Sequence, residues 1–187
     1  MRIIAGNLKG RKLSSIRGNT IRPTSDRMRE ALFNIVSDRI RGAVVLELFA
    51  GTGALGIEAL SRGAESVVFI DKYKDALLTI NKNIQTCKLE DKTKIINWDI
   101  AKNLNCLAPY QSCFNIVFMD PPYNKNLIKP ALQNIYKSSS LASQVLIVIE
   151  HSQEEPIPEN ISGFNIFDQR KYGKSFVSFI YFKMKGL

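Results

Sequence analysis

The sequence has a single histidine and only three cysteines among its 187 residues. Cys87, Cys106 and Cys113 are odd in number, and their spacing fits neither a zinc site nor a disulfide framework, so we expect free thiols in a reducing cytoplasm and no metal. His151 follows a predicted strand without an evident partner, and we interpret it as structural rather than catalytic. No stretch approaches the roughly 20 apolar residues of a membrane helix. The first residues lack the apolar core of a signal peptide, so we expect no membrane association.

The basic residues gather at the start of the chain. The net charge is +9, and residues 1–41 alone hold ten Lys or Arg against three Asp or Glu, a local net charge of +7. Clustered charge of this kind is typical of a surface that binds a polyanion, although a solvated basic face without a partner is the alternative. If this surface binds RNA, the candidate contact residues are Lys9, Arg11, Lys12 and Arg22.

The first part of the chain predicts a small extension to a larger domain. Residues 1–15 alternate in polarity around glycines and predict a short hairpin, and residues 16–23 predict a loop. Helix-capping residues then precede apolar residues at helical spacing, which predicts one helix that ends near Arg39. We therefore divide the chain into a basic extension, 1–41, and a main domain, 42–187.

The main domain alternates between strands and helices. The predicted strands are 43–48, 66–71, 94–98, 115–120 and 144–150, with helices at about 53–62, 73–87 and 126–137. This alternation predicts an α/β fold with a doubly wound, mostly parallel sheet. Two further runs, Phe164–Asp168 and Phe176–Phe182, predict a terminal antiparallel hairpin and a total of seven strands.

A glycine-rich loop follows the first predicted strand. Glycines at positions 51, 53 and 56 allow a tight turn and a close approach of the backbone to a ligand before a helix begins. The same spacing occurs in dinucleotide-binding proteins, so it does not by itself identify the cofactor. Asp71 ends the second strand. In dinucleotide sites and in S-adenosylmethionine sites alike, a carboxylate at this position accepts hydrogen bonds from the ribose hydroxyls. Asp99 closes the third strand, either near an adenine or as a solvated strand end.

The acid before the glycines distinguishes the two cofactor classes. We expect Glu47 to face the crevice, where a carboxylate repels a pyrophosphate but attracts the ammonium and sulfonium groups of S-adenosylmethionine. We therefore predict S-adenosylmethionine rather than a nicotinamide cofactor, and we also assign Phe49 and Lys72 to its pocket. The arrangement resembles motif I of the class I methyltransferases.

Four residues, Asp120, Pro121, Pro122 and Tyr123, follow the buried run Ile116–Met119. The two prolines end the strand and keep the preceding backbone extended. A carboxylate, a fixed carbonyl and an aromatic ring thus converge where α/β sheets bind ligands. These groups can orient a nucleobase amine by hydrogen bonds and hold the base by stacking. The alternative is a turn with a solvated aspartate. The tetrad resembles the Asp/Asn-Pro-Pro-aromatic motif of the amino-methyltransferases.

The whole chain resembles the RsmD family. The residues that carry this resemblance are Met1–Gly6, Lys9–Leu13, Arg22–Thr24, Asp26–Arg27, Arg29–Asn34, Leu48–Ala59 and Glu150–Ser152. Many relatives are expected to have aspartate where this chain has Glu47, a change that keeps the charge. The resemblance implies N2 methylation of one guanine, position 966, in bacterial 16S rRNA within a partly or fully assembled 30S particle.

The resemblance also implies a role for each site residue. Asp120 and the Pro121 carbonyl orient the guanine amine, and Tyr123 stacks on the base. We expect the reaction to need no metal and the protein to be a monomer. The tetrad alone does not distinguish guanine N2 from adenine N6, so an N6-adenine methyltransferase acting on RNA or DNA is the nearest alternative. A non-catalytic RNA-binding assembly factor and, more distantly, a hydride-transfer enzyme are the others.

Overall fold

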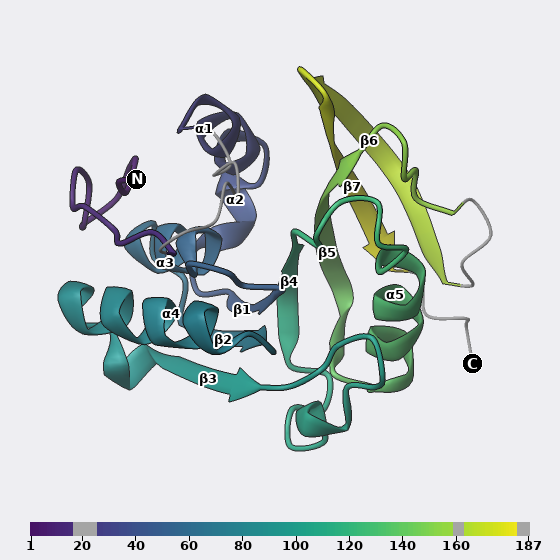
Figure 1. Ribbon diagram of the computed structural model, residues 1–187, viewed down its shortest axis with the longest axis horizontal. Helices are drawn as coiled ribbons and strands as arrows, with labels where there is room; N and C mark the ends of the chain where they lie inside the picture. Colours follow the sequence, from purple (N-terminus) through teal and green to yellow (C-terminus); the bar gives the residue numbers. More distant parts are fainter. Residues whose placement is uncertain (17–25, 159–162, 183–187) are drawn as a thin grey trace.

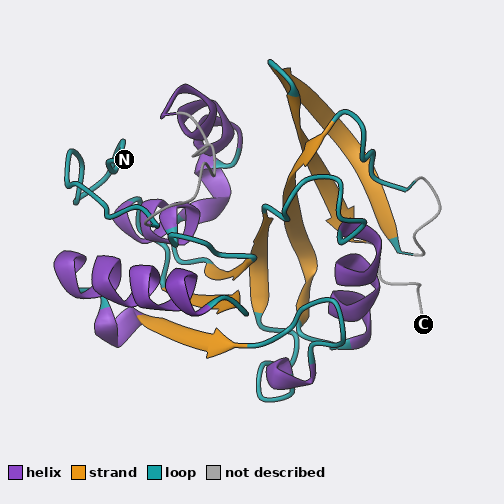
Figure 2. Ribbon diagram, viewed as in Figure 1, coloured by secondary structure: helices purple, strands orange, loops and turns teal. Residues whose placement is uncertain are grey.

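The computed structural model describes residues 1–16, 26–158 and 163–182. In this part of the chain seven strands form one sheet with the order β3-β2-β1-β4-β5-β7-β6 (Figures 1 and 2). The strands are β1 (Val44–Leu48), β2 (Ser66–Asp71), β3 (Thr93–Asn97), β4 (Phe114–Met119), β5 (Leu141–Ser152), β6 (Phe164–Tyr172) and β7 (Ser175–Phe182). The first five are parallel, and β7 pairs antiparallel with both β5 and β6. The predicted doubly wound sheet with a terminal hairpin is thus confirmed.

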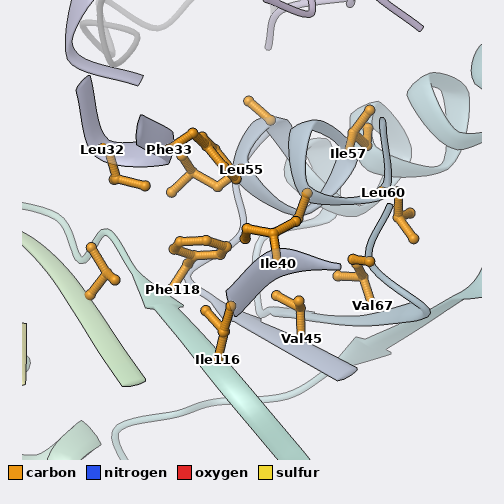
Figure 3. Close-up of a cluster of buried hydrophobic side chains, with 14 of the residues drawn as sticks. Leu32, Phe33, Ile40, Val45, Leu55, Ile57, Leu60, Val67, Ile116 and Phe118 are labelled. Carbon is orange, nitrogen blue, oxygen red and sulfur yellow. The ribbon is translucent and has the colours of Figure 1, made fainter. Parts of the chain in front are cut away.

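Helices cover both faces of the sheet. The helices are α1 (Asp26–Ile35), α2 (Ser37–Ile40), α3 (Ala54–Ser61), α4 (Lys74–Cys87) and α5 (Ile128–Lys137), with short 3-10 turns at Glu90–Lys92 and Asn105–Leu107. In one hydrophobic cluster the helices α1, α2, α3 and α4 pack on one face of the sheet. Phe33 and Phe118 are in contact there, with ring centroids 5.5 Å apart (Figure 3). A second cluster packs α5 on the opposite face. The central strands are therefore buried on both sides, as their continuous apolar runs predict.

The predicted single helix after residue 24 is in fact two. Helix α1 ends at Ile35, Val36 has φ −97° and ψ 7°, and α2 begins at Ser37. A β-branched residue followed by serine has low helix propensity, which explains a break at this position. Residues 24 and 25, where we placed the start of the helix, lie outside the described residues.

Residues 1–16 form an arm that lies on α3 and α4 (Figure 1). Its predicted hairpin is reduced to a single bridge between Arg2 and Lys12 and a few backbone hydrogen bonds. Glu58, a fully buried residue of α3, accepts hydrogen bonds from the amides of Ile4 and Ala5 at 2.8 and 3.0 Å. A polar cluster therefore fixes the arm to the sheet domain, while the boundary predicted at residue 41 stays a prediction.

His151 lies inside β5, not beyond a strand end, and it has partners that the sequence does not reveal. Its Nε2 is 2.9 Å from Ser178 Oγ, and its Nδ1 is 3.0 Å from the Ser152 carbonyl oxygen and 3.1 Å from that of Glu155. A buried imidazole with these neighbours ties β5 to β7 and to the turn after β5, which supports the structural interpretation. Within residues 1–16, 26–158 and 163–182, every helix is too short or too polar to span a bilayer.

Candidate active site

The predicted site residues gather at one edge of the sheet. Strands β1 to β5 run parallel, so their carboxyl ends lie at the same edge. The order of the strands reverses between β1 and β4, and this topological switch point is where open α/β sheets bind ligands. The glycine-rich loop follows β1 and the Asp-Pro-Pro-Tyr tetrad follows β4. The structure therefore brings the two halves of the predicted site onto adjacent strands.

The loop after β1 has the backbone conformation that its first two glycines predict. Gly51 and Gly53 have φ values of 55° and 73°, in the left-handed region that favours glycine. A Cβ at Gly51 would have only the Phe49 carbonyl oxygen within 4 Å, at 3.9 Å, so this side of the loop is open to a ligand. Phe49 itself has a φ of 57°, which is strained for an aromatic residue and typical of functional loops.

The sequence predicts that all three glycines allow the backbone to approach a ligand. Gly56, in contrast to the other two, serves the packing of a helix on the sheet. It lies within α3, where a Cβ would be 2.6 Å from the ring of Phe69 and 2.7 Å from Glu47 Oε2. The missing side chain lets α3 pack closely against β1 and β2. The Gly56 amide also donates a hydrogen bond of 2.7 Å to Glu47 Oε2.

Glu47 is more enclosed than the sequence predicts. Its side chain is 4% exposed and lies against α3, where it accepts a hydrogen bond from the Gly56 amide. Burial raises the pKa of Glu47 to about 8, although hydrogen bonds from the Gly56 and Leu55 amides oppose the rise. Burial therefore favours the protonated form of this carboxyl group, whereas a cation bound nearby would favour the carboxylate.

Asp71 holds the glycine-rich loop in place. Its Oδ2 accepts a hydrogen bond of 2.9 Å from the Gly51 amide, and its Oδ1 accepts one of 2.9 Å from the Tyr73 amide. Each carboxylate oxygen retains a lone pair for a second donor, as a ribose contact requires. Lys72 and Asp99, the other predicted cofactor residues on this side, lie together with Nζ and Oδ2 3.5 Å apart.

Asn83 connects the loop to the arm, and the sequence gives no signal for this role. Its fully buried amide Nδ2 donates hydrogen bonds to the carbonyl oxygens of Thr52, at 2.9 Å, and Ser14, at 3.2 Å. Its Oδ1 accepts a hydrogen bond of 2.7 Å from the Ser14 amide. Thr52 lies between Gly51 and Gly53, so one side chain of α4 positions both the glycine-rich loop and the basic arm.

The tetrad forms the other half of the site. The ring of Tyr123 is partly exposed, while its hydroxyl donates a hydrogen bond of 2.7 Å to Glu150 Oε1 and lies 2.9 Å from Ser175 Oγ. Burial and the charge of Glu150 raise the pKa of this phenol, so the hydroxyl stays protonated. The phenol is therefore held at its hydroxyl end while part of its ring remains accessible for stacking.

Asp120 lies among other acids. Burial, and then the charges of Glu150 and Glu47, raise the pKa of the Asp120 carboxyl well above its usual range. The three carboxyl groups belong to the adjacent strands β1, β4 and β5 or directly follow them. Such a site has a strong preference for ligands that bring hydrogen-bond donors or positive charge.

Three of the four predicted RNA-contact residues lie on the arm. Lys9, Arg11 and Lys12 are exposed, and Arg11 Nη1 also donates a hydrogen bond of 2.8 Å to the Thr86 carbonyl oxygen in α4. The fourth residue, Arg22, lies outside the described residues. The three described side chains thus form a basic surface on the element that Asn83 joins to the glycine-rich loop.

Comparison with known proteins identifies the family. The model of the family described as Conserved hypothetical protein 95, the RsmD family, matches residues 1–181. The chain belongs to this family. Ribosomal RNA small subunit methyltransferase D of Haemophilus influenzae is 38% identical over 165 residues, which cover 86% of this chain and 84% of that protein. The protein with the same name from Escherichia coli K12 is 33% identical over 174 residues, covering 93% and 86%.

Solved structures agree with the fold. The structure of the Escherichia coli protein yhhF matches with a TM-score of 0.85 and 32% identity, and the match covers 98% of each chain. The protein HI0767 of Haemophilus influenzae matches with a TM-score of 0.81 and 30% identity, again over 98% of each chain. The seven-stranded sheet with its antiparallel end is the class I methyltransferase fold.

Proposed function

We propose that the protein transfers a methyl group from S-adenosylmethionine to the exocyclic N2 of a guanine in 16S rRNA. The observation that carries this proposal is the position of the Asp120–Tyr123 tetrad, which follows β4 next to the glycine-rich loop after β1. The names of the Haemophilus influenzae and Escherichia coli relatives, which specify small-subunit rRNA, support the substrate class.

The glycine-rich loop after β1 and the acidic residues near it fit S-adenosylmethionine. The open side of Gly51 leaves room for a ligand against the backbone, and Asp71 offers carboxylate lone pairs to ribose hydroxyls. We assign Asp99 and Lys72 to the part of the pocket that holds the adenine of the cofactor, and Phe49 to the start of the glycine-rich loop. The acid-rich centre formed by Glu47 and Asp120 complements a ligand with two cationic groups. When bound, the cofactor supplies an electrophilic methyl group on its sulfonium.

The tetrad fits the exocyclic amine of a nucleobase that is unstacked from its neighbours in the RNA. Asp120 and the Pro121 carbonyl accept hydrogen bonds from the amine, and Pro122 keeps this backbone from forming a helix. The exposed ring of Tyr123 stacks on the base, an interaction worth about 1–3 kcal/mol. Guanine N2 lies on the Watson–Crick edge, so the base must be unpaired or flipped. Catalysis then rests on the orientation of the amine toward the methyl group.

The arm fits the role of an RNA-docking surface. Lys9, Arg11 and Lys12 present positive charge to phosphates, and we assign Arg22 to the same surface. We further propose that the substrate is rRNA in a partly or fully assembled 30S particle, and that the enzyme acts as a cytoplasmic monomer without a metal.

The test is methyl transfer from labelled S-adenosylmethionine to two substrates, naked 16S rRNA and particles that lack the modification. We expect transfer to a single guanine. The Asp120→Ala variant should lose turnover by about 100-fold or more while it keeps its affinity for the cofactor. The control Asp91→Ala changes an exposed acid of the 3-10 turn before β3 and should leave both quantities unchanged. A large loss of cofactor affinity in Asp120→Ala would contradict the assigned role.

Adenine N6 is the second candidate target, because Asp120 and the Pro121 carbonyl can accept hydrogen bonds from either amine. The methylated nucleoside distinguishes the two enzymes. Tight cofactor binding without transfer to either substrate would instead support a non-catalytic RNA-binding factor.

A further inference from the structure

Asp120 and Glu150 occupy equivalent positions on neighbouring strands. Strands β4 and β5 are parallel and in register, with Met119 opposite Ile149, so the next residues along the two chains lie side by side. Side chains at the same register point to the same face of a sheet, and adjacent strands are about 4.8 Å apart. The two carboxyl groups therefore lie next to each other beside the end of β4.

Glu150 is built into this position. It is 8% exposed, its Oε1 accepts the hydrogen bond from the Tyr123 hydroxyl, and Ser175 Oγ lies 2.9 Å from the same hydroxyl. In the described part of the chain no group of three or more acids, histidines or cysteines is arranged to hold a metal ion. A ligand with hydrogen-bond donors is therefore the better match for this pair of carboxyl groups.

The edge of guanine carries that pattern of donors. The N1–H and the N2 amine are adjacent on its Watson–Crick edge, and both are donors. On adenine the N6 amine is adjacent to N1, which is an acceptor and repels a carboxylate. The two neighbouring carboxyl groups can therefore accept hydrogen bonds from N1–H and from the N2 amine of guanine. On adenine the carboxyl group that faces N1 has no donor opposite it, and buried polar groups left unpaired reduce affinity strongly.

We propose that Glu150 is the residue that selects guanine, by accepting a hydrogen bond from N1–H while Asp120 accepts one from the N2 amine. This assignment rests on the proposed function and adds the group that distinguishes guanine N2 from adenine N6. It also gives a role to a residue that the sequence marks only through the family resemblance.

The test compares the rRNA substrate prepared with guanine or with 2-aminopurine at the target position. 2-Aminopurine keeps the N2 amine, but its N1 is an acceptor. The wild-type protein should prefer guanine strongly. In Glu150→Gln the side-chain amide can donate to N1 of 2-aminopurine, so the guanine preference, measured as kcat/KM, should fall by about 10- to 100-fold, the effect of one charged hydrogen bond. Glu150→Asp keeps the carboxylate and should keep the preference.

Tyr123→Phe is the matched control, since it removes the hydrogen bond to Glu150 without changing the carboxylate. Its activity should fall equally on both bases, so that the guanine preference is unchanged. If Glu150→Gln also loses activity equally on both bases, Glu150 only positions Tyr123 and the assignment is wrong. If the wild-type protein methylates neither guanine nor 2-aminopurine at the target position, the proposed function itself fails. It also fails if the methylated nucleoside in the rRNA is an adenosine.

A second measurement needs no variant. RNA with inosine at the target position keeps N1–H but has no amine to methylate, whereas adenine has no N1–H. The inosine RNA should inhibit the wild-type enzyme at least about tenfold more strongly than the adenine RNA. Equal inhibition by the two would overturn the assignment of Glu150.

Discussion

Truncation of Asn83 tests whether the arm and the glycine-rich loop share one support. In Asn83→Ala three hydrogen bonds are lost: the two that Asn83 donates to the Thr52 and Ser14 carbonyl oxygens, and the one that it accepts from the Ser14 amide. A typical hydrogen bond contributes about 0.5–1.5 kcal/mol, so we expect the free energy of unfolding to fall by about 2–4 kcal/mol. The asparagine is fully buried, so water does not readily replace the lost partners.

The effect on the cofactor site is smaller and separate. Only the hydrogen bond to Thr52 supports the loop, and its loss at about 1 kcal/mol corresponds to a dissociation constant about fivefold higher for S-adenosylmethionine. Urea unfolding gives the first quantity and titration calorimetry gives the second. Asn81→Ala, an exposed position on the same helix, is the control and should change neither.

One result would refute this reasoning. If Asn83→Ala lowers the unfolding free energy as expected but binds the cofactor as tightly as the wild-type protein, the loop keeps its shape without the asparagine. Asn83 would then fix only the arm.

Three further predictions concern packing, pH and salt. Gly56→Ala should lower the unfolding free energy by about 2–3 kcal/mol through overpacking, because a Cβ would be 2.6 Å from the Phe69 ring; an unchanged stability in urea would contradict this. Because the pKa of Glu47 rises from 4.5 to about 8 in the folded protein, stability should decline as pH rises through that window, by up to about 1.4 kcal/mol per pH unit. Glu47→Gln should flatten this decline, and an unchanged pH profile would refute the cause. Changing Arg11 and Lys12 to alanine should weaken RNA binding and reduce the slope of log Kd against log salt by about 1.4–1.8, whereas an unchanged slope would mean that RNA docks elsewhere.

The sequence predicts the sheet well because its signals are local. The double proline after β4 and the glycines after β1 end their strands through their own backbone preferences. The strands themselves are continuous apolar runs, which is typical of strands buried on both faces of a sheet. The terminal turn before Ser175 is predicted for the same reason. The break at Val36 is missed because helical spacing continues across it, from Leu32 to Ile40, and only propensity argues against a single helix.

The missed parts of the site depend on contacts between distant residues. Asn83 is 69 positions from Ser14 and 31 from Thr52, and on α4 it looks like any polar helix residue. The burial of Glu47 against Gly56 depends on how α3 packs, which the spacing of the glycines does not specify. The role of Glu150 similarly requires the register of β4 with β5, which only the structure provides.

The most direct test of the central claim is the identity of the methylated nucleoside. After transfer from S-adenosylmethionine to small-subunit rRNA, digestion and mass spectrometry of the product should give N2-methylguanosine from a single position. N6-methyladenosine, or no methylated nucleoside despite cofactor binding, would contradict the claim that the acids beside Tyr123 orient a guanine amine.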